Sequence, residues 1–151
     1  MGVKPGGGKM KTPWMEMSVR EFQSALASSS PTPGGGTAAA ISLGQAAALT
    51  IMVCDLTIGK EKWESGWDIA NKALPICVKI MSRAGELADL DSDAFDDVMA
   101  AYRMPKGDEK EIIIRKESIQ KSSIVATEIP FETSKLALEI LEILPELALK
   151  G

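Results

Sequence analysis

Residues 31–55 read PTPGGGTAAAISLGQAAALTIMVCD, and this stretch decides the fold. Two prolines and three consecutive glycines are followed by a run without charge that lasts until Asp55. Proline cannot continue a preceding helix, and glycine adopts backbone angles that other residues avoid. After Gly36 the composition becomes rich in alanine, which favours helix. The stretch therefore predicts a sharp loop that leads into a long, uncharged helix.

The predicted helix carries a stripe of small residues. Gly36, Ala40, Gly44 and Ala48 are spaced four apart and fall on one face. Such small side chains let another backbone approach closely. A helix that is apolar nearly all round is buried on most sides, so we expect this one at the centre of a helical bundle, with a subunit interface as a further place for it. Its larger apolar residues are Ile41, Leu43, Leu49, Ile51, Met52 and Val53.

A transmembrane helix is the alternative interpretation, because the uncharged run is long enough to span a bilayer. Against it stand the polar residues Thr37, Ser42, Gln45 and Thr50, the many weakly hydrophobic alanines, and the lack of a basic flank at the N-terminal end. We therefore expect no membrane partner.

The composition limits the classes of function. The chain has 151 residues, of which 45% are hydrophobic and 25% charged, which suits one soluble domain with its own core. The net charge of −4 provides no basic field, so we expect no nucleic-acid partner. Residues 1–12 contain no apolar segment of the kind that a signal peptide needs, and a cytoplasmic location is the expectation.

The chain contains no histidine, which removes Ser-His and Cys-His nucleophile systems, histidine bases and histidine-ligated metals. Cys54 and Cys77 lie in apolar helical patterns, and we interpret them as buried reduced thiols rather than as a disulfide or reactive thiols. Two distant cysteines make a poor metal site. We expect no metal or bound cofactor, and any catalysis must use carboxylates, lysines, arginines, hydroxyls and backbone dipoles.

The chain divides into a flexible N-terminal tail over residues 1–16 and a helical domain over residues 17–151. A Ser-Val-Arg-Glu capping box begins the first helix at Ser18, and the central helix ends near Gly59. A third helix contains Pro75, where we expect a kink or a fresh start. Asp108 caps a fourth helix with Ile112 turned inward, and a fifth restarts or kinks at Pro130. The prediction is an all-α bundle of about five long, partly kinked helices.

Asp91 interrupts the apolar face of the third helix. A desolvated carboxylate without a partner is costly, so this residue needs an explanation. It caps a new helix that begins at Ser92, or it faces a cleft and performs acid–base chemistry. Its apolar neighbours on that face are Cys77, Ile80, Met81, Ala84, Leu87 and Ala88 before it and Phe95, Val98, Met99 and Tyr102 after it.

The glycine loop also has two interpretations. Gly34, Gly35 and Gly36 at a helix N-terminus leave N–H groups free to meet an anion. They do not form a nucleotide phosphate loop, because no Gly-Lys-Ser/Thr follows and no strand precedes them. The alternative is a tight connection where two backbones touch.

Three lysines follow predicted helices. Lys60 and Lys62 come after the central helix, and Lys106 comes after the helix that carries Asp91. Each is a solvated lysine that compensates a helix C-terminus, or together they form a cationic rim for a ligand that bears carboxylates.

Four segments together resemble the cyclodeaminase domain of formiminotransferase-cyclodeaminase and its stand-alone relatives, which include methenyltetrahydrofolate cyclohydrolases. The segments occur in the family's order and at similar separations, and the resemblance covers about residues 18–144. They are PTPGGGTAAA (31–40), LTIGKEKW (56–63), DSDAFDDVMAAYRMPK (91–106) and SSIVATEIPFE (122–132).

The resemblance implies an all-helical fold that forms a homodimer through its helices, with a folate site between helices near the subunit contact. It implies chemistry on the one-carbon unit of tetrahydrofolate. In the cyclodeaminase, N10 attacks the formimino carbon on N5 and ammonia leaves; in the cyclohydrolase, water opens the methenyl bridge to a formyl group. Neither reaction requires a metal, a redox cofactor or a histidine.

The resemblance also implies site residues. Asp91 matches the aspartate of the family's D-x-x-A-F motif, and we assign it the acid–base role. The loop glycines would shape the pocket or present N–H groups, and the lysines would bind the glutamate tail of folate. These substrate-binding residues are Gly34, Gly35, Gly36, Lys60, Lys62 and Lys106.

One departure from the family concerns the C-terminal end. Relatives continue past the last helix with a segment that bears Gly-Asn and Ser-Asp, whereas this sequence ends at Gly151. The rival hypothesis is therefore a non-catalytic helical dimerisation module that keeps the fold and has lost the site. The residues do not distinguish deamination from hydrolysis, and they do not name the pterin.

Overall fold

The computed structural model describes residues 12–151, so most of the expected N-terminal tail lies outside the described residues. Every regular element in the described part is helical, which confirms the all-α prediction. The elements are a 3₁₀ turn η1 (Trp14–Glu16), α1 (Val19–Leu26), α2 (Gly35–Thr57), a 3₁₀ segment η2 (Glu61–Gly66), α3 (Trp67–Tyr102) and α4 (Glu109–Lys150).

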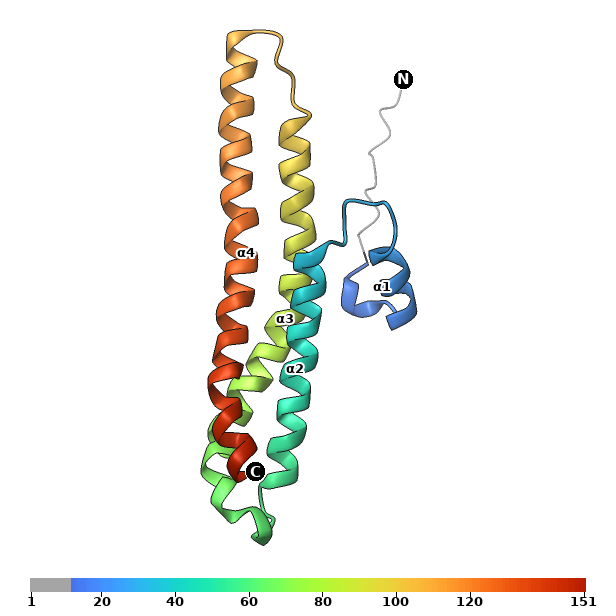
Figure 1. Ribbon diagram of the computed structural model, residues 1–151. Coiled ribbons are helices and arrows are strands. Elements are labelled where there is room, and N and C mark those ends of the chain that lie inside the picture. Colours follow the sequence, from blue (N-terminus) through green and yellow to red (C-terminus); the bar gives the residue numbers. More distant parts are fainter. Residues whose placement is uncertain (1–11) are drawn as a thin grey trace, which may run out of the picture.

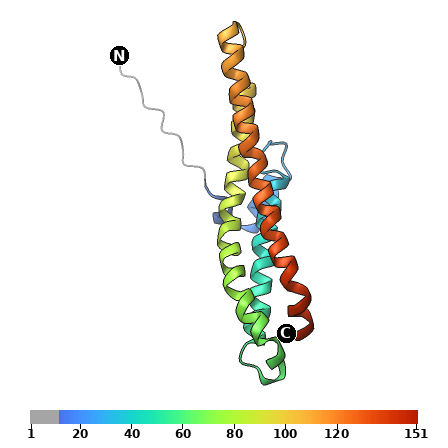
Figure 2. The ribbon, with the colours of Figure 1, turned by 90° about the vertical axis from the view of Figure 1, so that its left-hand side faces the viewer.

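Two very long helices, α3 and α4, run antiparallel along the molecule (Figure 1). The shorter α2 packs beside the lower half of these two helices. The view turned by 90° in Figure 2 also shows α2 beside this lower half. The upper part of the α3–α4 hairpin extends beyond α2 as two helices alone. Helix α1 and η1 lie at the N-terminal end of α2, to one side of the hairpin.

Of the two expectations at Pro75 and Pro130, a kink or a fresh start, the fresh start is wrong, and the described residues form four α-helices instead of about five. Pro75 lies inside α3, and Pro130 and Pro145 lie inside α4. Proline removes one backbone hydrogen bond from a helix and crowds the preceding turn. Burial next to Pro130 offsets that cost, because Ile129 and Thr133 of the same helix are buried in the bundle. Tertiary packing thus carries α4 through a local helix breaker.

The predicted helix boundaries are confirmed where a cap defines them. Ser18 forms the full capping box with Glu21 at the start of α1. The Asp108 carboxylate accepts a hydrogen bond of 2.8 Å from the N–H of Glu111 at the start of α4. Gly59 has φ of +75° just after α2, a conformation that glycine adopts without strain.

The small-residue stripe forms part of the contact between α2 and α3. Ala40 is fully buried, and a Cβ built on Gly44 would lie 3.4 Å from the Cβ of Ala84 in α3. Ala48 is exposed, however, so the stripe is buried over only part of its length. The two backbones approach closely because alanine and glycine face each other there.

The expectation that α2 is buried on most sides is wrong for the single chain. Leu49, Met52 and Leu56 remain 60%, 51% and 60% exposed. The reason is that α3 and α4 pack along one side of the helix, whereas η1 and α1 reach only its amino end. Helix α2 is long and apolar enough to cross a membrane, a property that the core helices of soluble proteins share.

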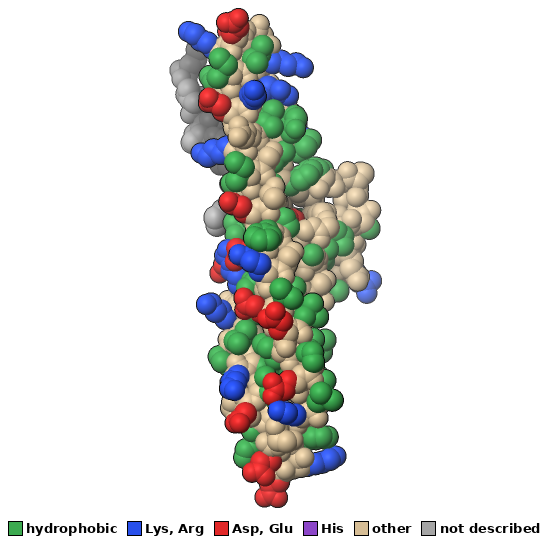
Figure 3. All heavy atoms as spheres, turned by 60° about the vertical axis from the view of Figure 1, so that its left-hand side comes forward, with side chains coloured by type: hydrophobic (Ala, Val, Ile, Leu, Met, Phe, Trp, Pro, Cys, Tyr) green, Lys and Arg blue, Asp and Glu red, His purple; other side chains and the backbone are tan. Residues whose placement is uncertain are grey.

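Most of the apolar face of α3 is buried up to Leu87 and Ala88, although Met81 is 42% exposed, and the face is more exposed beyond Asp91. Phe95 is 43% exposed and Tyr102 is 54% exposed. Ile112 of α4, which was expected to point inward, is 51% exposed. These residues lie in the upper hairpin, where no third helix covers them (Figure 1). On the face drawn in Figure 3, hydrophobic side chains alternate with charges of both signs along the whole length.

The packed structure includes part of the expected tail. Trp14, in η1, is only 8% exposed and belongs to the same buried cluster as Ala40 and Leu87. Its ring meets Phe22 of α1 edge to face, with the ring centroids 6.0 Å apart. Trp14 therefore packs against the helical bundle, although the sequence places it in the expected tail.

Candidate functional site

Asp91 lies in the middle of α3, so it does not cap a new helix at Ser92. The helix runs through both residues without a break. Asp91 is half-buried, and its position on α3 faces the first turn of α2. The explanation for this carboxylate must therefore lie in the contact between the two helices.

Gly36 makes room for the Asp91 carboxylate. A Cβ built on Gly36 would lie 2.6 Å from Cγ of Asp91, much closer than real Cβ contacts. Gly35 has nothing within 4 Å of its built Cβ, and Gly34 has only the carbonyl oxygen of Pro31, at 3.8 Å. Of the three loop glycines, Gly36 is thus the one that a close approach requires, and the other two lie at the entrance to α2.

Thr37 also holds the carboxylate. Its hydroxyl donates a hydrogen bond of 3.0 Å to Oδ2 of Asp91 and lies 2.8 Å from the hydroxyl of Ser92. Ser92 in turn accepts a hydrogen bond of 2.9 Å from the indole Nε1–H of Trp14. Thr37 and Ser92 are fully buried.

Sequence reasoning missed Trp14, Thr37 and Ser92. The available signal was their position: Thr37 directly follows the glycine loop, and Ser92 directly follows Asp91. Trp14 gave no such signal, because it lies 78 residues from Ser92 in the chain. Only the packing of η1 against α3 brings it there.

The Asp91 carboxylate lies beside the amino end of α2. The first turn of α2 begins at Gly34, which supplies no side-chain cap for the free N–H groups. The amino end of a helix carries partial positive charge, so a negative group beside it is stabilised.

Among the described residues, no three His, Cys, Asp or Glu side chains are placed to hold a metal ion.

Gly36 also lines a groove between α2 and α4. The groove has a volume of about 420 Å³ and is mostly apolar. Its polar side chains are Ser42 of α2 and Thr133 and Ser134 of α4. Asp91 contacts Gly36 but does not itself line this groove.

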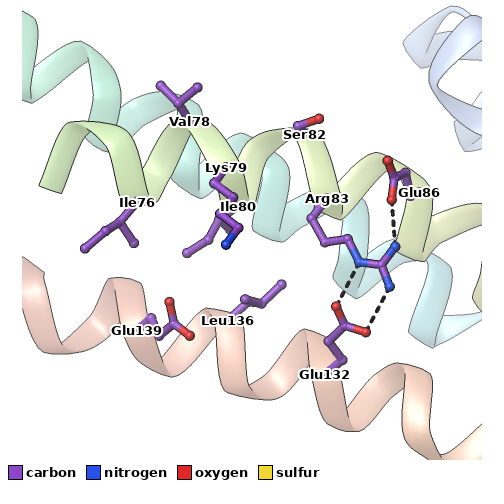
Figure 4. Close-up of a pocket in the computed structure, with 10 residues that line it drawn as sticks. All are labelled: Ile76, Val78, Lys79, Ile80, Ser82, Arg83, Glu86, Glu132, Leu136 and Glu139. Carbon is purple, nitrogen blue, oxygen red and sulfur yellow. Dashed lines mark hydrogen bonds and ion pairs between the residues drawn. The ribbon is translucent and has the colours of Figure 1, made fainter.

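A larger groove of about 720 Å³ lies between α3 and α4 and contains none of the predicted site residues (Figure 4). Arg83 crosses it with two hydrogen bonds to Glu132, of 2.8 and 3.1 Å, and a third of 2.6 Å to Glu86. The hydrogen bonds from Arg83 lower the pKa of Glu132, and the bonds to Glu132 and Glu86 raise the pKa of Arg83. These groups satisfy one another and therefore join the two helices.

The predicted lysines lie far from Asp91 within one chain. Lys60 precedes η2, and the ammonium group of Lys62 lies 4.6 Å from the ring centroid of Trp63. The 23 residues of α2 separate both from the glycine loop, a length of about 34 Å. Lys106 follows the end of α3, and about 16 Å of helix separates Asp91 from Tyr102. The structure therefore brings Asp91 and Gly36 together, and it leaves the three lysines apart from them.

Comparison with known proteins gives a consistent set of relatives. The family described as formiminotransferase-cyclodeaminase matches residues 18–151. A methenyltetrahydrofolate cyclohydrolase from Methylorubrum extorquens is 39% identical over 135 residues, which cover 89% of this chain. A formimidoyltransferase-cyclodeaminase from Dictyostelium discoideum is 36% identical over 129 residues, or 85% of this chain, and one from Gallus gallus is 32% identical over 109 residues, or 72%.

The chain spans only part of each relative. The match covers 64% of the Methylorubrum cyclohydrolase, 23% of the Dictyostelium protein and 20% of the Gallus protein. The matched region is therefore shared by the Methylorubrum protein, whose name gives one activity, and by the longer Dictyostelium and Gallus proteins, whose names give two.

Proposed function

This chain belongs to the formiminotransferase-cyclodeaminase family, and from that premise we propose that it is an enzyme acting on the N5/N10 one-carbon unit of tetrahydrofolate. The observation that carries the proposal is the contact between Asp91 and Gly36. It unites the carboxylate of the D-x-x-A-F segment with the glycine loop, two segments on which the resemblance rests. The substrate is a tetrahydrofolate derivative, and no further cofactor is required.

Hydrolysis of the methenyl bridge is the leading form of the proposal. The Methylorubrum cyclohydrolase supports it, because the match there covers most of both proteins. In this reaction Asp91 takes a proton from water while the water oxygen bonds to the one-carbon unit. It then returns that proton to the nitrogen that leaves, and the hydroxyl proton of the intermediate goes to solvent. The product carries a formyl group.

Cyclodeamination is the second form, supported by the matches to the bifunctional relatives. Here N10 attacks the formimino carbon on N5, and Asp91 takes the proton of N10. The formimino nitrogen takes one proton from solvent and a second from the carboxylic acid of Asp91, its bond to carbon breaks, and it leaves as ammonia while the one-carbon unit remains as a methenyl bridge between N5 and N10. Both forms need one group that accepts and returns a proton, and general acid–base catalysis of this kind accelerates reactions by about 10²- to 10⁴-fold.

The proposal extends to a homodimer. Within one chain Lys60 and Lys62 lie at the far end of α2 from the glycine loop, so a second copy supplies them in this proposal. The exposed apolar residues of α2 give such a copy a surface to cover. In this arrangement Gly34 and Gly35 border the pocket, and Lys60, Lys62 and Lys106 approach the tail of the substrate.

The cytoplasm is the proposed location. Cys54 and Cys77 are free and buried, and desolvation raises the pKa of both thiols. Buried free thiols without a disulfide suit a reducing compartment.

The test is Asp91→Asn, assayed by the absorbance of methenyltetrahydrofolate and by ammonia release from formiminotetrahydrofolate. Asparagine keeps the shape and can still accept the hydrogen bond from Thr37, so the protein should fold normally. Turnover should fall by about 10²-fold or more, because the proton acceptor is lost. Asp97→Asn is the control, since Asp97 is an exposed carboxylate on the same helix.

Activity of Asp91→Asn equal to the wild type would remove Asp91 from the acid–base role. The rival, a non-catalytic dimerisation module, predicts no turnover by the wild type and no heat on calorimetric titration with tetrahydrofolate. Heat of binding together with turnover of either substrate excludes that rival.

A further inference from the structure

We infer that Trp14, Ser92 and Thr37 are positioning residues that orient the Asp91 carboxylate through one continuous chain of hydrogen bonds. The inference rests on the proposed function, because it names what holds the proposed catalytic group. It draws on three side chains that the sequence patterns did not single out for function. Two of them are fully buried and the third is 8% exposed, so the chain is shielded from solvent.

The direction of the chain follows from the number of hydrogens available. An ionised carboxylate only accepts, so Thr37 donates its single hydroxyl hydrogen to Oδ2 of Asp91. The bond between Thr37 and Ser92 must then be donated by Ser92. The Ser92 hydroxyl oxygen accepts from the indole of Trp14, which is only a donor. Every hydrogen therefore points toward the carboxylate.

This direction strengthens the hold on Asp91. Hydrogen bonds that run the same way in a buried site polarise one another, and those that end on a charge are the stronger ones. The negative charge of Asp91 thus polarises each hydrogen bond in turn, including the bond that the indole N–H of Trp14 donates to Ser92. The four side chains belong to η1, α2 and α3, so the chain also ties the N-terminal segment to the site.

The hydrogen bonds from Trp14 through Thr37 leave one oxygen of the Asp91 carboxylate, Oδ1, available to react. Thr37 occupies Oδ2, and Oδ1 lies over Gly36, where a side chain at residue 36 would collide with it. In the described part of the chain no side chain donates to Oδ1. A substrate proton can therefore be taken at Oδ1 while Thr37 keeps the carboxylate plane fixed.

The test measures the coupling directly, by NMR of the indole N–H groups in ¹⁵N-labelled protein. The chain has three tryptophans, and Trp14→Phe assigns the resonance of interest. Thr37→Val keeps the shape of the side chain and removes the hydroxyl. The indole proton of Trp14 should then shift upfield and exchange faster, although residue 37 does not bond to it. Thr37→Ser should restore the wild-type resonance.

Thr50→Val is the matched control, because Thr50 is also buried in α2 and its hydroxyl bonds to the carbonyl oxygen of Ala46 in the same helix. It should leave the Trp14 resonance unchanged. Asp91→Asn provides a second route if Thr37→Val does not fold, since it removes the charge at the far end of the chain. An unchanged Trp14 resonance in Asp91→Asn, or in a folded Thr37→Val, overturns the inference.

Kinetics add a second readout. Thr37→Val should lower kcat by about tenfold and leave KM nearly unchanged, because Thr37 orients the carboxylate and does not touch the substrate. A changed KM with unchanged kcat would overturn the positioning role. If the wild type turns over neither folate, the proposed function fails, while the indole resonance still decides whether the hydrogen-bond chain exists.

Discussion

The Asp91 side chain packs closely against Gly36 at the amino end of α2. The absence of a Cβ at residue 36 leaves space that the carboxylate fills, and Thr37 fixes the carboxylate there. A short aspartate side chain held in this way has little freedom to move aside. The conformational freedom of Gly36 matters less here than its size.

Gly36→Ala should therefore destabilise the protein by about 1 to 3 kcal/mol, because the new methyl group overlaps Asp91 and breaks its bond to Thr37. Gly35→Ala is the matched control in the same turn, where nothing lies within 4 Å of the new atom. It should be neutral or stabilising by up to about 1 kcal/mol. Urea unfolding of both variants makes the comparison, and equal stabilities would contradict the close packing at residue 36.

At the scale of elements, the molecule depends on a long α3–α4 hairpin. Both helices continue through prolines, and they are joined away from the candidate site by Arg83 and Glu132. The fork of the guanidinium matches the two carboxylate oxygens, which is the stronger geometry for an ion pair. Glu86 bonds to the same guanidinium but belongs to the same helix as Arg83, so it adds no link between helices.

Glu132→Gln should therefore cost more stability than Glu86→Gln, by about 0.5 to 1 kcal/mol, since both pairs are partly exposed to solvent. Arg83 lowers the pKa of Glu132 below its usual 4.5 in the folded state. The contribution is therefore present above pH 4.5 and is lost as the pH falls through the lowered value. Thermal unfolding from pH 7 to pH 3 should show the two variants converging; a constant difference would contradict this assignment.

At the scale of the whole molecule, one chain leaves much apolar surface uncovered. Leu49, Met52, Val53 and Leu56 of α2 recur at helical spacing and are between 37% and 60% exposed. A helix with a single charged residue, Asp55, is unusual on a free surface. Contiguous apolar patches of this kind mark interaction sites, which is why the proposed function includes a second copy.

Light scattering coupled to size exclusion should find a dimer for the wild type, and Leu49→Glu with Leu56→Glu should convert it to monomer, because charges would then be buried in the contact. Val19→Glu is the control, since Val19 is an equally apolar position, 68% exposed, on α1. A monomeric wild type at micromolar concentration would contradict the dimer, and the lysines would then have no route to the Asp91 site.

The sequence by itself determined the class of the fold and most of the local structure. The capping residues Ser18 and Asp108 and the stop at Gly59 depend on neighbours within a few residues, and the structure agrees at each. Asp91 also stood out locally, because a carboxylate in an apolar face has no local explanation. The resemblance of the motifs to a known family is confirmed by the matching relatives.

Only the tertiary structure decided what those residues do for one another. Local rules break α3 and α4 at their prolines, but burial against neighbouring helices stabilises the continuous forms. The sequence left two interpretations of Asp91, a helix cap or a catalytic carboxylate. The packing places it over Gly36 and beside Thr37, inside a continuous helix. Trp14 lies far away in the chain and joins the site only through the fold. The physical reason is range: caps and periodicity act over one or two helical turns, whereas a packed site is made of contacts between segments that the sequence keeps apart.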